Sequence, residues 1–136
     1  MKLHGTFEVT GWDEQAYREQ GGEKLTRASV TQRFSGSVEG EGSVEWLMCY
    51  RPDGTAHFVG LQRIEGRVEG KPGALTLETI GDFDGEKATG DWRVVAGAGT
   101  GAFEHATGKG RFSAPMGPSA TFDLQLRFLQ PAHASN

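Results

Sequence analysis

The sequence predicts an all-β protein that folds as a single eight-stranded antiparallel β-barrel. Apolar and polar residues alternate along most of the 136 residues, as they do in strands with one buried face. The 21 glycines lie largely between these alternating runs, where they mark turns. A turn in the middle of the chain also sets the register of two strands. Many short strands with one apolar face close most simply into a barrel, because closure removes exposed sheet edges.

The expected strands follow one another along nearly the whole chain. They are placed at residues 3–10, 24–34, 36–50, 55–69, 73–83, 87–96, 107–114 and 119–129. Residues 12–23 are polar and charged, and we expect them to form a loop or a short helix that crosses one mouth of the barrel. Residues 1–130 then make one domain, and residues 131–136 a flexible C-terminal tail.

The central hairpin turn is Arg51-Pro52-Asp53-Gly54-Thr55. Proline presets φ at its position, aspartate bonds its own backbone, and glycine takes the left-handed conformation. If Arg51 pairs with Thr55, the register of the flanking strands follows. The expected pairs are Tyr50–Ala56, Met48–Phe58, Trp46–Gly60 and Val44–Gln62. The even-numbered residues of both strands then share one apolar face, which predicts a barrel wall.

The inner face of this wall is the candidate ligand site. We expect the site to be lined by Trp46, Tyr50, Phe58, Gln62, Trp92 and Phe122, with Thr26 and Thr79 as further inward polar residues. Tyr50 could donate a hydrogen bond to a ligand oxygen, and Gln62 could orient a carbonyl group or a bound water. Both could instead bond to backbone carbonyls or buried water at a barrel end. Space is limited, because the interior of an eight-stranded barrel is small and three Trp and eight Phe can fill it.

The outer face is not uniformly polar. In the expected register, four outward residues lie side by side near the hairpin turn: Leu47, Cys49, Val59 and Leu61. Adjacent outward apolar residues need a cover, which could be residues 12–23 or a second subunit. We expect a homo-oligomer that uses these four residues as its interface.

Composition and charge exclude several classes of function. The net charge is −4 with acidic and basic residues interleaved, which does not suit nucleic-acid binding. The chain begins without an apolar signal region and has no run long enough for a membrane span, so we expect a cytoplasmic protein. The four histidines and single cysteine show no metal-ligand spacing. We therefore expect no nucleic-acid partner, no membrane partner, no metal and no cofactor.

The sequence identifies no catalytic residue. Glu45 and Glu78 are carboxylates on adjacent expected strands, but their parity places both outside the barrel. His57 is expected opposite Cys49 on the outer face, which favours an interface or surface role. The stretch Gly97–Ala102 fits the dinucleotide pattern G-x-G-x-x-A, yet no long helix and no second parallel strand follow it. Whether the protein is an enzyme stays open.

Several stretches resemble a known superfamily of barrels. Residues 99–112, Gly-Thr-Gly-Ala-Phe-Glu-His-Ala-Thr-Gly-Lys-Gly-Arg-Phe, resemble a hairpin of the allene-oxide-cyclase and dirigent barrels. Residues 24–30, 45–56, 58–63 and 99–101 resemble a bacterial family of uncharacterised proteins assigned to that superfamily. The resemblance implies an eight-stranded, calycin-like antiparallel barrel. It carries over no catalytic residue; Glu8 is nearest by position to the cyclase glutamate, but its parity is outward.

Three hypotheses for the function remain. The first is a cytosolic barrel that binds a small, largely apolar molecule in its core. The second is a cofactor-free isomerase or cyclase, which the resemblance suggests and which needs an inward titratable group such as Tyr50. The third is a packed scaffold whose outward apolar residues bind a protein partner.

Overall fold

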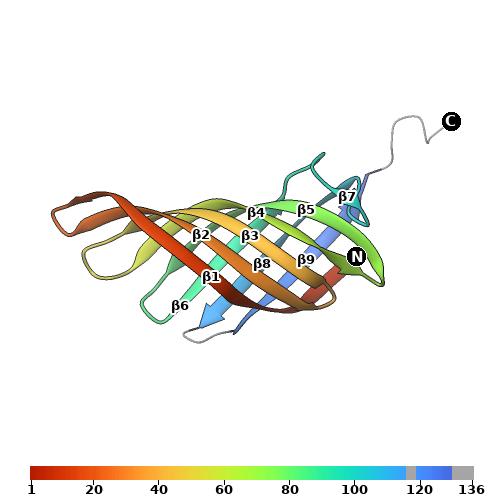
Figure 1. Ribbon diagram of the computed structural model, residues 1–136, viewed down its shortest axis with the longest axis horizontal. Helices are drawn as coiled ribbons and strands as arrows, with labels where there is room; N and C mark the ends of the chain where they lie inside the picture. Colours follow the sequence, from red (N-terminus) through yellow and green to blue (C-terminus); the bar gives the residue numbers. More distant parts are fainter. Residues whose placement is uncertain (116–118, 130–136) are drawn as a thin grey trace.

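A computed structural model describes residues 1–115 and 119–129 (Figure 1). Its strands are β1 (Lys2–Gln20), β2 (Glu23–Gly36), β3 (Glu39–Tyr50), β4 (Ala56–Val68), β5 (Lys71–Phe83), β6 (Lys87–Val94), β7 (Thr100–Gly101), β8 (Ala106–Pro115) and β9 (Ser119–Phe128). All except β7 form a closed ring of eight antiparallel strands, in the order β4-β3-β2-β1-β9-β8-β6-β5 and back to β4. The predicted fold class is therefore confirmed. The described residues contain no helix, and hence none that could span a membrane.

The central hairpin has the register expected from its turn. Arg51 N–H donates to the Thr55 carbonyl at 2.8 Å, and Gly54 has a φ of 89°. The Asp53 carboxylate accepts a hydrogen bond from the Thr55 backbone at 2.9 Å. Tyr50 pairs with Ala56, and the register continues without a shift to Glu39 and Arg67. The alternation inferred on either side of this turn therefore holds along the full length of β3 and β4.

The expectation for residues 12–23 was wrong. These residues continue β1 to Gln20, turn at Gly21 and Gly22, and return as β2. The first half of β1 pairs with both β2 and β9, whereas residues 9–20 pair with β2 alone. This second half lies beyond the end of β9, as the long hairpin in Figure 1 shows. Because one edge and much of both faces meet solvent there, a polar sequence is compatible with a strand.

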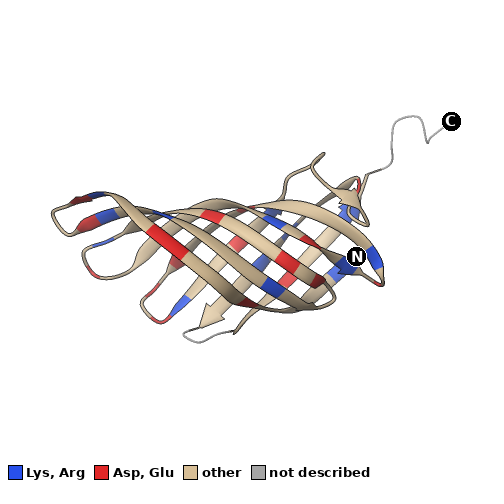
Figure 2. Cartoon of the chain, viewed as in Figure 1, with Lys and Arg blue, Asp and Glu red and all other residues tan. Residues whose placement is uncertain are grey.

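Aromatic side chains form a connected cluster in the barrel interior, among buried aliphatic residues. Seven rings contact one another with centroid separations of 5.1–6.5 Å: Phe7, Phe34, Trp46, Phe58, Trp92, Phe112 and Phe122. Acidic and basic residues are interleaved along the strands (Figure 2), at positions that are mostly exposed. Burial of the apolar face is the main source of stability in such a barrel.

One end of the barrel is closed by the loop between β6 and β8. Phe103 in this loop has 0% exposure and belongs to the core. Strand β7 holds the loop against β5, where Ala102 N–H donates to the Pro72 carbonyl at 2.9 Å. A Cβ at Gly99 would lie 2.1 Å from the Phe103 carbonyl oxygen, so this close approach requires glycine. The glycines of the dinucleotide-like pattern thus shape a loop that closes the barrel. The expected C-terminal tail, residues 131–136, lies outside the described residues.

Candidate functional site

The two ends of the barrel differ in how completely their apolar side chains are covered. We call the end that is closed by the β6–β8 loop the Phe103 end; there the loop packs on the core. At the opposite end, here the Tyr50 end, inward side chains from four strands pack on the core and remain only half-buried: Tyr50, Phe83, Ala88 and Ala114. A concave apolar surface with a few fixed polar groups is typical of a small-molecule site. This end is therefore the candidate site.

A bulge in β1 brings two further residues to the inner face of this end. The register shifts between Val9 and Gly11, after which Trp12 pairs with Val30 and Glu14 with Ala28. Val30 and Ala28 are buried in the core, and directly paired residues point to the same side of a sheet. Trp12 and Glu14 therefore face inward. Trp12 lies 5.7 Å from Trp46, centroid to centroid, yet is 48% exposed.

The Glu14 carboxylate is held by three donors. Thr26 Oγ1 donates to Oε2 at 2.6 Å, Tyr50 O–H donates to the same oxygen at 2.7 Å, and Trp12 Nε1 donates to Oε1 at 3.0 Å. Partial burial raises the pKa of Glu14, but these hydrogen bonds and the positive charge of Lys24 outweigh it and leave the pKa below its ordinary value. Glu14 is thus an anionic acceptor in a fixed position.

Tyr50 is the protonated partner of this carboxylate. Burial and the hydrogen bond to Glu14 both raise its pKa, so its hydroxyl stays protonated at neutral pH. The Lys24 ammonium lies over the Tyr50 ring, 4.9 Å from its centroid, which is a cation–π distance. The Tyr50 end therefore combines aromatic surface, a fixed carboxylate and a nearby cation.

Four polar side chains are fully buried: Thr26 beside Glu14, and Gln32, Gln62 and Thr79 deeper in the barrel. Gln62 Nε2 donates to Gln32 Oε1 at 2.6 Å. Five buried side-chain atoms have no protein partner among the described residues: Gln32 Nε2, Trp46 Nε1, Gln62 Oε1, Thr79 Oγ1 and Trp92 Nε1. Buried polar atoms normally have partners, so a group of five in one interior indicates a need for further hydrogen bonds.

The structure places the six predicted ligand residues at different depths. Tyr50 lies at the barrel end beside Glu14. Trp46, Phe58, Trp92 and Phe122 belong to the aromatic core, and Gln62 lies beneath it with Gln32. A Cβ at Gly81 would lie 2.6 Å from the Phe58 ring, and one at Gly90 would lie 2.3 Å from the Phe112 ring. These two rings therefore lie over glycines of β5 and β6.

The expected interface residues form an exposed outer patch on β3 and β4. Leu47, Val59 and Leu61 are 50%, 37% and 58% exposed, and Cys49 is half-buried beside them. Ile80 on β5 pairs with Val59 and extends the patch. Residues 12–23, one of the two expected covers, form a strand and hairpin with β2 instead and leave these side chains exposed.

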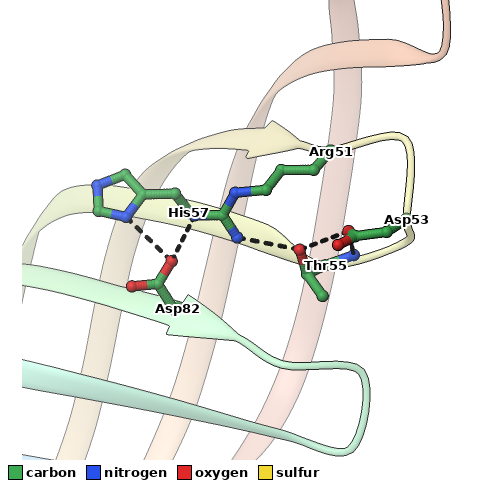
Figure 3. Close-up of polar contacts among 5 residues, drawn as sticks. All are labelled: Arg51, Asp53, Thr55, His57 and Asp82. Carbon is green, nitrogen blue, oxygen red and sulfur yellow. Dashed lines mark hydrogen bonds and ion pairs between the residues drawn. The ribbon is translucent and has the colours of Figure 1, made fainter.

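A polar cluster borders this outer patch at the Tyr50 end (Figure 3). Asp82 accepts a hydrogen bond from Arg51 at 2.9 Å and lies 3.2 Å from His57 Nδ1. The hydrogen bond from Arg51 is the main cause that holds the pKa of Asp82 below its ordinary value. His57 pairs with Cys49 across β3 and β4 as expected, but its ring is directed at Asp82. This cluster ties the hairpin to β5.

The remaining sequence candidates lie outside the site. Glu45 is on the outer face in an ion pair with Arg27 at 2.9 Å, and Glu78 also faces outward. Among residues 1–115 and 119–129, no group of three metal-ligating side chains converges. Sequence reasoning missed Trp12, Glu14 and Gln32. The one available signal for the first two was Gly11, because a glycine inside a strand often marks a bulge.

Comparison with known proteins agrees with this architecture. The family described as "Protein of unknown function (DUF3224)" matches residues 3–126. A crystal structure of a protein with unknown function from the DUF3224 family of Shewanella oneidensis MR-1 has a TM-score of 0.82 and 24% sequence identity. The alignment covers 96% of this chain and 98% of that one, and it shows a shared fold. The search of curated proteins found no match. The chain belongs to the DUF3224 family.

Proposed function

We propose that the protein binds a small, largely apolar molecule that enters the barrel at the Tyr50 end. The observation that carries this proposal is the position of Trp12. Trp12 is half-exposed, its ring packs at a tilt of 59° against the buried Trp46, and its N–H is tied to Glu14. An apolar surface held in place on the concave side of a sheet favours a ligand over water.

The six ligand residues expected from the sequence lie at different depths in the barrel, so a molecule that enters at the Tyr50 end would meet them in turn. Tyr50 and Trp46 meet the molecule with Trp12, and Phe58 lies directly behind them. Gln62, Trp92 and Phe122 contact the molecule only if the molecule reaches the centre of the barrel. Because the core rings touch one another, entry requires the Phe58 and Phe112 rings to turn aside from the glycines on which they lie.

Native mass spectrometry tests the proposal directly. The protein purified from its own host should carry a reproducible small-molecule adduct that is released on denaturation. In parallel, N-phenyl-1-naphthylamine, a neutral apolar fluorophore, should bind the wild type and bind Trp12→Ala at least about five-fold more weakly. Leu61→Ala, which removes an exposed apolar side chain from the outer face, is the control and should bind normally. Equal binding by both variants would contradict this location.

A second candidate is cofactor-free isomerisation or ring closure, the chemistry implied by the resemblance to allene-oxide-cyclase-like barrels. One observation favours it: Glu14 and Tyr50 form an inward pair of titratable groups, where the sequence offered Tyr50 alone. A general base must reach the proton it removes, and Glu14 is already placed on the inner face. Once a ligand is identified, turnover that survives both Glu14→Gln and Tyr50→Phe would exclude this role.

A further inference from the structure

One row of residues across the barrel interior combines three of the unpaired polar atoms. Trp46 on β3 pairs with Gly60 on β4, Gly60 pairs with Thr79 on β5, and Thr79 pairs with Trp92 on β6. Trp46, Thr79 and Trp92 are 7%, 0% and 2% exposed. Each has its side-chain polar atom buried without a protein partner. The row therefore holds two indole N–H donors and a hydroxyl.

A glycine lies between these groups. A Cβ at Gly60 would lie 2.6 Å from Cδ1 of Trp46, the ring atom bonded to Nε1. The Trp46 ring therefore lies over Gly60 and is directed along the row toward Thr79, the residue that pairs with Gly60 on its other side. No side chain separates the Trp46 indole from Thr79 along this row.

The unpaired groups are mainly donors. The two indoles and Gln32 Nε2 can only donate, Gln62 Oε1 can only accept, and the Thr79 hydroxyl can do either. A group that completes most of these hydrogen bonds is therefore an acceptor oxygen. The fully buried polar side chains of the described residues are threonines and glutamines, with no lysine or arginine. A carboxylate would lose its hydration here without gaining a counter-ion, whereas a neutral carbonyl loses little.

We infer that the row Trp46–Thr79–Trp92 binds the neutral carbonyl oxygen of the apolar ligand, as in a ketone, aldehyde or ester. This inference rests on the proposed function and names the chemistry of its ligand. Trp12 and Trp46 contact the apolar part at the Tyr50 end. The carbonyl oxygen accepts hydrogen bonds from the indoles and from Thr79.

The three tryptophans of the chain make the inference measurable. Each indole N–H gives its own signal in a ¹H–¹⁵N correlation spectrum of the labelled full-length protein. Trp12 reports on the Tyr50 end, while Trp46 and Trp92 report on the row. The probes are acetophenone, α-methylstyrene, which replaces the carbonyl oxygen by a CH₂ group, and benzoate, which replaces the methyl group by a charged oxygen.

Acetophenone should move the Trp12 signal and shift the Trp46 and Trp92 signals downfield, as new hydrogen bonds do. It should bind about ten-fold more tightly than α-methylstyrene, the ratio that one net hydrogen bond supports. Equal affinities with no downfield shift would overturn the inference while leaving apolar binding intact; buried water alone would then partner the row. No change at Trp12 with either neutral probe would overturn the proposed function itself. Tighter binding of benzoate would refute the preference for a neutral oxygen.

Two threonine variants separate the row from general packing. Thr79→Val keeps the shape of the side chain and removes its hydroxyl, so the preference for acetophenone should fall at least three-fold. Affinity for α-methylstyrene should not change. Thr26→Val is the comparison variant: Thr26 is equally buried, but its hydroxyl holds Glu14 at the Tyr50 end, so its loss should change the affinity for both probes alike and leave their ratio unchanged. If both variants changed the preference alike, the row would have no special role.

Discussion

Replacing Glu14 tests the hydrogen bonds that organise the Tyr50 end. Glu14→Ala removes the acceptor of Trp12, Thr26 and Tyr50. Trp12 and Tyr50 can turn to water, but the Thr26 side chain is 1% exposed and its hydroxyl would lose its partner. A buried hydroxyl without a partner costs about 1–3 kcal/mol, and the lost bond was to a charged group. We therefore expect Glu14→Ala to lower the free energy of unfolding by about 2–4 kcal/mol.

Glu14→Gln is the matched variant. Its amide oxygen can still accept from Thr26 and Tyr50, while its NH₂ group faces the Trp12 N–H and loses that bond. The expected cost is about 1 kcal/mol. Urea unfolding at neutral pH measures both variants, and the midpoint for Glu14→Ala should fall by about 1–2 M for a typical slope. Equal, small effects from both variants would refute the view that Glu14 stabilises a buried donor.

The comparison with Glu14→Gln also predicts a pH dependence. The pKa of Glu14 in the folded protein lies below its unfolded value, so its carboxylate stabilises the fold above a pH of about 4.3. That contribution is lost as the pH falls through the folded pKa. The stability difference between wild type and Glu14→Gln should therefore shrink between about pH 6 and pH 3. A difference that grew on acidification would have the wrong sign.

Three further predictions concern other parts of the barrel. Phe103→Ala should destabilise the protein by about 3–5 kcal/mol in urea unfolding, because it empties a fully buried position at the closed end; a loss below about 1 kcal/mol would show that the loop does not close the core. Gly90→Ala should cost about 1–3 kcal/mol, since its Cβ would lie 2.3 Å from the Phe112 ring; retained wild-type stability would show that this ring moves freely. We propose that the outer patch joins two copies of the chain, so sedimentation velocity should show an oligomer that Leu61→Asp dissociates, with the unfolding free energy of the monomer changed by less than about 0.5 kcal/mol. A wild type that sediments as a monomer would remove this proposal.

The register of β3 and β4 was predictable because the residues of their turn determine its hairpin type. Arg51 to Thr55 admits few hairpin types, and a fixed pairing at the turn determines which residues oppose one another along both strands. Trp46, Phe58 and Gln62 were therefore assigned correctly to the inner face, and Leu47 and Leu61 to the outer face. The turn residues should fix the register in the same way at any hairpin with so short a turn.

The site at the Tyr50 end was less predictable because it depends on an irregularity. Parity counted from Phe7 places Val9 inside and Glu14 outside, and the bulge at Val9/Gly11 reverses this count. The polar composition that followed suggested a loop, since no local pattern reveals that one edge of β1 loses its neighbour after Glu8. Pairing across the ring, which brings β9 to β1, is a long-range property that only the closed barrel defines.

The filled core is compatible with ligand entry because of where its rings lie. At the Tyr50 half of the barrel, Trp46, Phe58 and Phe112 each lie over a glycine of a neighbouring strand: Gly60, Gly81 and Gly90. A ring that packs on glycine contacts backbone, so turning it aside exposes a recess that no other side chain occupies. At the Phe103 half, Leu75 and Leu77 are fully buried, and in a close-packed core moving such a side chain would displace its neighbours. Glycines also lie beneath Phe34, Phe103 and Phe122, so packing on glycine is common to the whole core. What distinguishes the Tyr50 half is that its rings on glycine adjoin the half-exposed Trp12, which gives a ligand a route to them.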